Sequence, residues 1–357
     1  MSSLFILSTP IKPNRMKKNK KITIKDLSKY LSLSTSTVSR AFSENQNINS
    51  NTKKRILEAA KKFDYKPNRL ALSLKSGQTK NIGVIVPEMV TPYAISVIRG
   101  IENVLYTKDY QIIVKVSDED KDKERDNILF LENLKVDALI VSTSNEAENI
   151  DLYQKLISNG TPIIFYDRIP NIKLEVPKVI VKDAIYSSLM VEHLVSIGKK
   201  KIVHILGPDT IRNAKEREIG YDRILKKHQL YDKKLKVKVK QLSTFEGKKA
   251  IEELIHKNIQ FDAIFAFSDI LAIGAMNFLL EKGYKIPKDV AVASFSGTIL
   301  SSMLHPQLTT VESPLEEMGE KAALLTLEKI ENPTIENKTI VLDSNLAYRS
   351  STYQIEE

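Results

Sequence analysis

From Asn81 onward, continuous apolar runs alternate with segments of helical periodicity, and this alternation limits the possible folds more than any other feature of the chain. Runs such as IGVIVP, QIIVKV and VDALIV are separated by patterns such as AISVIRGIENVLY, and the series restarts after about Val181. Strands that are apolar along their whole length are typical of parallel sheets with helices on both faces. The sequence therefore predicts an α/β body of two doubly wound lobes, with a ligand-binding cleft between them.

Residues 22–65 differ from this body because they carry three short helical patterns. Thr23 precedes IKDLSKYL and Ser34 precedes TSTVSRAF, so each is placed to cap a helix, and Asn49 or Ser50 precedes a third helix. Only Leu31 to Leu33 separate the first two helices, and so tight a connection predicts a helix-turn-helix. We expect its small core to contain Leu27, Leu33, Val38, Ala41, Ile56, Leu57 and Phe63.

Charge is distributed unevenly along the chain. The formal net charge is +10, but residues 11–80 hold 18 Lys and Arg against 4 Asp and Glu, whereas the other residues hold 36 against 40. A compact basic segment is typical of a nucleic-acid-binding module. A solvated Lys-rich surface is the alternative, and charge alone does not decide between the two.

Several functional classes lack the residues that they require. The chain has no cysteine, which excludes disulfides, thiolate nucleophiles and cysteine-ligated metals, and its five histidines are scattered. We find no GxGxxG, P-loop or GxSxG motif, so we predict no cofactor and no enzymatic activity. No apolar run is long enough to span a membrane and no signal peptide is recognisable, so we expect a soluble cytoplasmic protein with no membrane partner.

These changes of pattern divide the chain into four segments. We predict a disordered arm, a helix-turn-helix domain, a linker with one helical turn and the two-lobed body, at residues 1–20, 21–66, 67–80 and 81–357. Within the body we expect an N-terminal lobe of about 81–181 plus 296–322, and a C-terminal lobe of about 182–295 plus 323–357. Either Met1 or Met16 is the start of the natural chain.

The head resembles bacterial transcription regulators of the LacI/GalR type, through ITIKDLSKYLSLSTSTVSRAF and the following YKPNRLALSLKSG. Downstream, VIRGIENVL, IIFYDR, HLVSIGKKKIVHILGP, FSDILAIGAM and PQLTTVESPLEEMGEKAA resemble the same family in the same order. The resemblance extends over about residues 20–350. It implies a periplasmic-binding-protein-like body and a transcriptional repressor that binds a pseudo-palindromic, double-stranded operator as a homodimer on the cytoplasmic nucleoid.

In this family the second helix of the head enters the major groove. The resemblance therefore places Thr35 and Ser36 at the base edges, where a hydroxyl discriminates poorly between bases. One turn further on, Arg40 is expected to contact a base or an adjacent phosphate, since a guanidinium can bind guanine through two hydrogen bonds. The remaining expected DNA contacts are to phosphates or at the cap of the reading helix, and they involve Thr23, Lys25, Ser34, Ser39 and Asn51.

The resemblance also implies that the linker becomes a hinge helix on DNA, paired in the minor groove with the hinge helix of a second subunit. Leu74 matches the apolar wedge that opens a base step and kinks the duplex, although ordinary helix packing is an alternative role. The family often has Arg where this chain has Leu72. One minor-groove or phosphate contact is thereby lost.

For the body, the resemblance implies a small effector between the lobes, a sugar or a related metabolite. Four residues match family motifs, namely Tyr93 in TPYA, Arg168 in YDR, Arg217 in KEREIGY and Asp269 in FSDILAIGAM. Their side chains suit a sugar, because a ring stacks on C–H groups while a carboxylate or guanidinium binds hydroxyls. Asp269 as a helix cap and Arg217 as a surface charge are the alternatives, and Phe245 is a further candidate for the wall.

Departures from the family pattern leave the effector open. The usual Asn-Pro-Phe-Phe is TPYA here, the usual Gly-Phe-Asp-Asp is Ser294-Phe295-Ser296-Gly297, and Ser268 replaces Asn. A rebuilt pocket motivates two alternatives: the same regulator controlled by a protein partner, or a sugar-processing enzyme with an incidental basic head. In the main hypothesis, ligand binding changes the orientation of the lobes, and with it the spacing of the two hinge helices.

Overall fold

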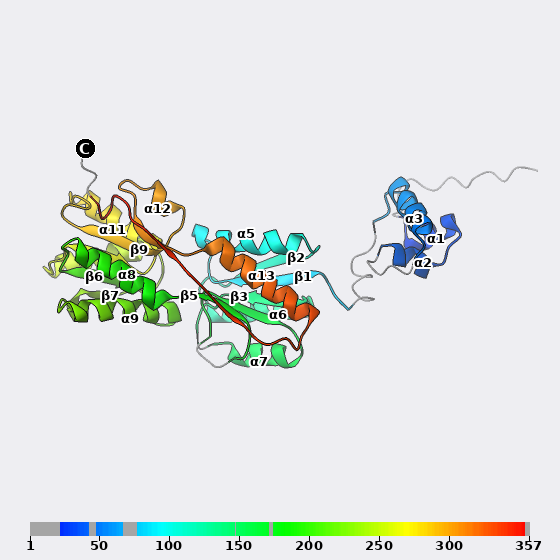
Figure 1. The fold of residues 1–357 in the computed structure, drawn as a ribbon, viewed down its shortest axis with the longest axis horizontal. Helices are drawn as coiled ribbons and strands as arrows, with labels where there is room; N and C mark the ends of the chain where they lie inside the picture. The colour runs from blue at the N-terminus through cyan, green and yellow to red at the C-terminus, as the bar shows by residue number, and fades with distance from the viewer. Residues whose placement is uncertain (1–21, 43–47, 67–76, 147, 171–173, 354–357) are drawn as a thin grey trace, which may run out of the picture. The chain divides into compact units, whose positions relative to one another are not determined.

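The computed structural model describes residues 22–42, 48–66, 77–146, 148–170 and 174–353 (Figure 1). The chain divides after Gly77 into a small unit and a large unit, each with its own hydrophobic core. The arm expected at 1–20 lies outside the described residues, as does most of the expected hinge helix, including Leu74. No helix in the described part of the chain is long and apolar enough to cross a membrane.

The small unit contains α1 (Ile24–Leu31), α2 (Thr35–Ala41) and α3 (Ser50–Lys62). At the start of α1, the Thr23 hydroxyl accepts from the Asp26 amide at 3.3 Å while the Asp26 carboxylate accepts from the Thr23 amide at 3.0 Å. This capping box confirms that Thr23 caps the helix. Ser34 caps α2 by accepting from the Thr37 amide at 3.1 Å, also as predicted. Asn49 rather than Ser50 caps α3.

The core of the small unit confirms most of the predicted residues and corrects one. Leu33 and Phe63 are partly buried against a centre that contains Leu27, Val38, Ala41 and Ile56. Leu57 was predicted in this core, but its side chain is 43% exposed. On α3 the residues that face inward are Ile56, Ala59, Ala60 and Phe63, spaced i, i+3, i+4, i+7, so Leu57 points about 100° away from that face.

The large unit has two lobes, which confirms the predicted α/β class. The sheet of the first lobe is parallel throughout, in the order β11 (Thr339–Leu342), β5 (Lys178–Val181), β4 (Ile163–Tyr166), β3 (Ala138–Val141), β1 (Asn81–Val86), β2 (Gln111–Val116). One face of this sheet is covered by α5 (Pro92–Tyr106) and α13 (Leu315–Glu331), and the other by α6 (Lys121–Asn133) and α7 (Ile150–Ser158) (Figure 1).

The second lobe repeats this arrangement with one antiparallel strand. Its sheet has the order β12 (Asn345–Ala347), β10 (Thr309–Glu312), β9 (Ala291–Ser296), β8 (Ala263–Ala266), β6 (Ile202–Leu206), β7 (Lys236–Lys238), and only β12 runs antiparallel to its neighbour. Two helices cover each face: α8 (Asp183–Ser196) with α9 (Arg212–Lys227), and α10 (Thr244–His256) with α11 (Asp269–Glu281). The connections contain η1 (Lys233–Leu235) and α12 (Leu300–Met303).

The chain crosses between the lobes three times, and this corrects the predicted lobe boundaries. The first crossing, between β5 and α8, falls where the sequence predicted it. Residues 296–312 were assigned to the first lobe, but β10 pairs with β9 and extends the second sheet. Residues 323–342 were assigned to the second lobe, yet α13 packs on α5 and β11 pairs with β5 in the first lobe. Apolar periodicity identifies a strand but not the sheet that it joins, so the later crossings were not predicted.

Paired helices approach closely where glycine replaces a side chain. A Cβ atom on Gly100 of α5 would lie 2.0 Å from the carbonyl oxygen of Glu316, and a Cβ atom on Gly319 of α13 would lie 2.0 Å from that of Val97. Backbone atoms cannot move aside as the end of a flexible side chain can. The two helices that cover the first lobe therefore depend on both glycines for their spacing.

We expect Gly319→Ala to destabilise the large unit by about 1–3 kcal/mol, because the added methyl group forces α5 and α13 apart. An unhindered Gly→Ala change inside a helix would instead stabilise it by about 0.5–1 kcal/mol, so the sign of the effect tests the close approach. Urea unfolding measures the difference, with Lys321→Ala on the same helix as the control. A Gly319→Ala variant more stable than the wild type would contradict the packing described.

Candidate functional site

The first turn of α2 presents a hydroxyl-rich surface in the small unit. Thr35 and Ser36 are exposed, whereas Val38 and Ala41 on the opposite side are buried in the core. Ser34 Oγ lies 2.8 Å from Ser36 Oγ and 2.8 Å from Thr37 Oγ1, so the cap also engages the Ser36 hydroxyl. Thr35 lies next to Ser34 and Ser36 in the chain and is exposed.

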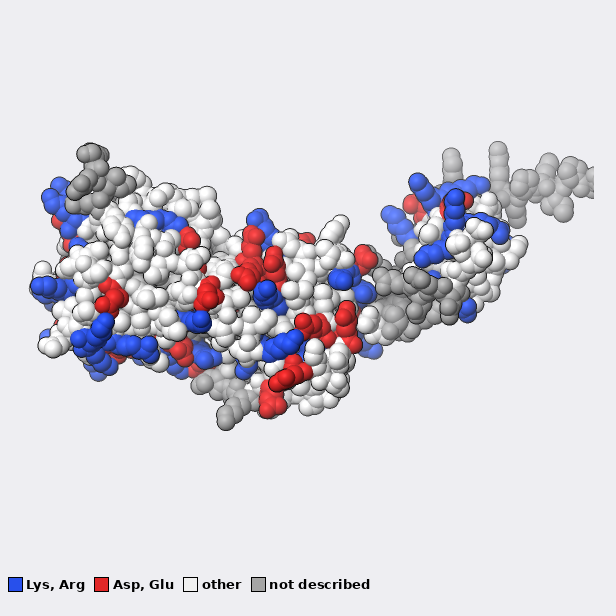
Figure 2. Space-filling view, in the orientation of Figure 1, with Lys and Arg blue, Asp and Glu red and all other residues white. Residues whose placement is uncertain are grey.

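The other residues predicted to contact DNA are mostly exposed in the small unit. Arg40 is exposed near the end of α2, and Lys25 is exposed in the first turn of α1. Asn51 is exposed at the start of α3, where its backbone amide donates to the Asn49 side chain at 3.0 Å, and Ser39 is half-buried. Thr23 has a local role, because its hydroxyl donates to the Asp26 carboxylate at 2.7 Å. On the face of the small unit seen in Figure 2, Lys and Arg outnumber Asp and Glu.

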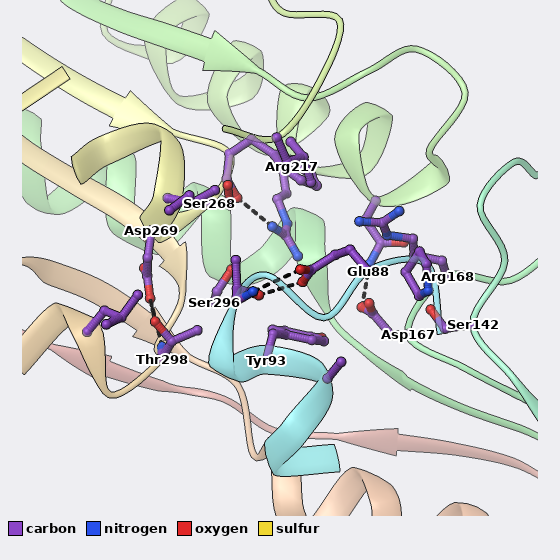
Figure 3. A pocket seen from close by; sticks show the side chains of 18 of the residues that line it. Glu88, Tyr93, Ser142, Asp167, Arg168, Arg217, Ser268, Asp269, Ser296 and Thr298 are labelled. Carbon is purple, nitrogen blue, oxygen red and sulfur yellow. Dashed lines mark hydrogen bonds between the residues drawn. The ribbon is translucent and has the colours of Figure 1, made fainter. Parts of the chain in front are cut away.

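A cavity lined by both polar and apolar side chains lies between the two lobes of the large unit, at the carboxyl ends of the strands (Figure 3). Its volume is about 60 Å³, which is room for several waters or a small ligand. From the first lobe its walls take Pro87, Glu88, Thr91, Tyr93, Ala94, Ser142, Tyr166, Asp167 and Arg168. From the second lobe they take Asn213, Arg217, Leu242, Phe267, Ser268, Asp269, Ile270, Ser296, Thr298 and Leu300.

Arg217 reaches the cavity from α9, and its guanidinium is buried rather than a surface charge. Its Nε donates to Asp183 at 2.8 Å and its Nη1 donates to the Phe267 carbonyl oxygen at 2.6 Å. The guanidinium carbon also lies 3.7 Å from the ring centre of Phe295 and 4.3 Å from that of Phe267. Burial raises the pKa of Asp183 to about 6, against the opposing effect of Arg217.

Arg168, the second residue after β4, forms a pair with Glu119. Its Nη1 donates to both carboxylate oxygens of Glu119, at 2.7 and 2.9 Å. Burial disfavours the charge of Arg168, but Glu119 more than compensates and raises the arginine's pKa. Both arginines predicted from the sequence thus border the cavity, each with a carboxylate partner.

Asp269 lines the cavity with its carboxylate already saturated. One oxygen accepts from Ser294 at 2.6 Å and Thr310 at 2.9 Å, and the other accepts from the Thr298 amide at 2.7 Å and hydroxyl at 2.8 Å. A carboxylate has about four acceptor positions, and all are used here. Asp269 is the first residue of α11 and Ser268 is the N-cap, so the alternative role of Asp269 as the cap is wrong. Its carboxylate instead ties α11 to β9, β10 and the loop between them.

Other hydroxyl groups in the cavity wall are buried without a hydrogen bond in the described part of the chain. They belong to Ser142 after β3 and Ser268 before α11, whereas the Tyr93 hydroxyl on α5 faces the carboxylate of Asp167. Burial, and then the nearby Asp167 carboxylate, raise the pKa of Tyr93 well above its ordinary value. A buried polar group without a partner costs free energy, and a bound ligand would supply the missing hydrogen bonds.

Phe245 does not line this cavity, which corrects its prediction as a wall residue. It lies in the first turn of α10 with its side chain 68% exposed. Sequence reasoning also missed Ser142, Asp167 and Asn213, although the first two directly follow buried strands, where cleft residues are expected. The Asn213 amide donates to Asp167 at 2.8 Å and so joins the two lobes across the cavity.

Two family models match the chain. The model of the lacI family of bacterial regulatory proteins matches residues 23–68, and the model of periplasmic binding proteins and the sugar binding domain of the LacI family matches residues 79–349. The transcriptional regulator RegA of Clostridium acetobutylicum is 32% identical over 335 residues, covering 92% of this chain and 98% of the relative. The ribose operon repressor of Halalkalibacterium halodurans is 28% identical over 330 residues, covering 92% of this chain and 97% of the relative.

A crystal structure of the Lac repressor dimer, bound to operator and the anti-inducer ONPF, supports the same fold. It matches with a TM-score of 0.83 and 21% identity, over 94% of this chain and 100% of that chain. A helix-turn-helix unit followed by a two-lobed body with a cavity between its lobes defines a DNA-binding transcriptional regulator. The chain belongs to the LacI family of bacterial regulatory proteins.

We expect Asp269→Asn to lower the stability of the large unit by about 1–3 kcal/mol, because an amide nitrogen would face hydroxyl or amide donors in place of an acceptor oxygen. Thermal unfolding of the full chain measures this loss. Asp209→Asn, at an exposed ion pair with Lys238, is the matched control and should change little. Equal stability of Asp269→Asn and the wild type would show that the four hydrogen bonds contribute little.

Proposed function

We propose that this regulator binds a pseudo-palindromic operator as a homodimer, and that a small sugar-like effector between the lobes modulates its operator affinity. One observation carries the effector role. Buried hydroxyls without partners face one cavity from both lobes, Ser142 from the first and Ser268 from the second. A polyhydroxylated ligand can donate to and accept from both, and would thereby favour one arrangement of the lobes over others.

In the small unit we assign base reading to Thr35 and Arg40. Both are exposed on α2, and Arg40 has the chemistry to bind a guanine edge through two hydrogen bonds. The Ser36 hydroxyl is hydrogen-bonded to the cap residue Ser34, which supports a secondary role for Ser36 in base recognition. Lys25 and Asn51 are assigned to phosphates, with Ser39 as a further contact and Thr23 acting through the cap of α1.

The cavity residues divide into ligand contacts and supporting residues. We assign stacking on the sugar ring to Tyr93. We assign hydrogen bonds with the ligand to Ser142, Ser268 and those N–H groups of Arg168 and Arg217 that do not bind protein partners. Asp269 supports the wall, because its acceptor positions are occupied. A change in lobe orientation would pass through the three crossings to the linker at 67–80. There Leu74 would act as the wedge in the minor groove.

We further propose that the protein is a repressor, that it acts on the nucleoid in the cytoplasm, and that it is not an enzyme. The named relatives support this, since they are transcriptional regulators. The buried hydroxyls of Ser142 and Ser268, called open here because they have no hydrogen-bond partner among the described residues, favour a functional cavity over a vestigial one. They therefore favour a small effector over control by a protein partner alone.

Replacing Arg40 by Ala should weaken binding to the preferred operator by about 1–3 kcal/mol and relax the choice of base at one position of each half-site. Operator selection from random duplex DNA, followed by anisotropy titration of the full chain, measures both effects. Lys25→Ala is the matched comparison, since loss of a phosphate contact should weaken all duplexes alike and reduce the salt dependence by about one unit. Unchanged selectivity in Arg40→Ala would refute the assignment.

Removal of an open hydroxyl should weaken effector binding without harming the fold. For a sugar that raises the melting temperature of the wild type, we expect Ser142→Ala and Ser268→Ala each to weaken binding about 2–10-fold, the range of one neutral hydrogen bond. Each variant should be as stable as the wild type or more so without ligand, because a buried unpaired hydroxyl disappears. Calorimetric titration measures affinity, and Ser158→Ala on the outer helix α7 is the control.

A further inference from the structure

We propose that the cavity selects uncharged ligands and rejects acidic ones, because Glu119 and Asp183 neutralise its two arginines from outside the lining. This inference rests on the proposed effector role of the cavity and narrows the chemical class of the effector. It makes Glu119 a specificity-determining residue that acts through Arg168 without touching the ligand.

The first pair is held in place by the backbone. Arg168 donates through Nη1 to both oxygens of Glu119, and the arginine side chain is only 10% exposed. The Glu119 amide in turn donates to the Pro87 carbonyl oxygen at 2.9 Å, which anchors this loop next to the cavity wall. An arginine held this way in a partly buried pair offers little net positive charge to a ligand.

The second pair is more deeply buried. The side chains of Arg217 and Asp183 are 4% and 9% exposed, and Nε lies 2.8 Å from the carboxylate. Another donor of Arg217 is taken by the Phe267 carbonyl oxygen, and the rings of Phe267 and Phe295 lie close to the guanidinium. The charge of Arg217 is therefore balanced before a ligand arrives.

Three further carboxylates, in the cavity wall itself, give the cavity an excess of negative charge. Glu88, Asp167 and Asp269 line it, and the described lining contains no lysine or histidine. With the two outer carboxylates, five acids stand against two guanidiniums. The raised pKa of Asp183, about 6, agrees with a buried site where negative charge is disfavoured. A phosphate or carboxylate group entering this site would lose its hydration and meet net repulsion.

The lining side chains that have no hydrogen-bond partner among the described residues are neutral. The hydroxyls of Ser142 and Ser268 can each donate and accept, which matches the hydroxyls of an uncharged sugar and offers no compensation for an anion. Glu119→Gln keeps the size of the side chain but removes its charge. The variant should leave Arg168 without the carboxylate that is bonded to it, so that its guanidinium can pair with the acidic group of a ligand and acidic ligands bind more tightly than in the wild type.

The experiment compares matched neutral and acidic compounds by calorimetric titration of the full chain, using D-ribose with D-ribose 5-phosphate and D-glucose with D-glucuronate. In the wild type, each acidic compound should bind at least tenfold more weakly than its neutral partner. In Glu119→Gln, this ratio should shift at least tenfold toward the acidic compound. Glu148→Gln, at an exposed pair with Lys121 outside the lining, should leave the ratio unchanged.

Inorganic phosphate serves as a probe that does not require a sugar to be recognised. The wild type should not bind it in the cavity, whereas Glu119→Gln should bind it, and Arg168→Gln in the same background should abolish that binding. Wild-type preference for an acidic compound or for phosphate would overturn the inference, as would an unchanged ratio in folded Glu119→Gln. Failure of every neutral compound to bind, with operator binding intact, would instead count against the proposed effector role.

Discussion

A buried ion pair between Arg217 and Asp183 holds the second lobe together at the point where the chain enters it. Asp183 begins α8 directly after the first crossing, and Arg217 on α9 reaches past it to the carbonyl oxygen of Phe267 at the end of β8. The pair thus joins two helices and a strand end beneath the cavity. Removing one partner would leave a buried charge uncompensated, which typically costs several kcal/mol.

The charged side chains around the cavity are already bound to protein partners. Its capacity to bind a ligand comes from the few hydroxyls that have no partner among the described residues. Arg168, Arg217 and Asp269 are the residues that a sugar-binding pattern would single out first, yet each is engaged by protein partners. The open hydroxyls stand on a wall that these charged residues make rigid. A preorganised wall with neutral open groups suits a ligand recognised by shape and hydroxyl pattern.

Communication between cavity and DNA depends on how the lobes are joined. Besides the three crossings, Asp167 accepts from Asn213, and the Glu146 amide donates to the Thr210 carbonyl oxygen at 3.0 Å, both between the lobes. Lys215 also forms an ion pair with Glu146. A ligand that bridges Ser142 and Ser268 would therefore compete with or reinforce these interactions between the lobes. A few such interactions are enough for a coupling of about 1–3 kcal/mol.

The sequence by itself determined the class of the body, the three helices of the head and the caps at Thr23 and Ser34, because periodicity and capping are local properties of the chain. It also pointed to Tyr93, Arg168, Arg217 and Asp269, all of which border one cavity. Only the tertiary structure decided that β10 and β11 exchange lobes, that Phe245 faces solvent, and that Asp269 is saturated while Ser142 and Ser268 are open. Each of those depends on contacts between residues far apart in the chain, for which no local pattern exists.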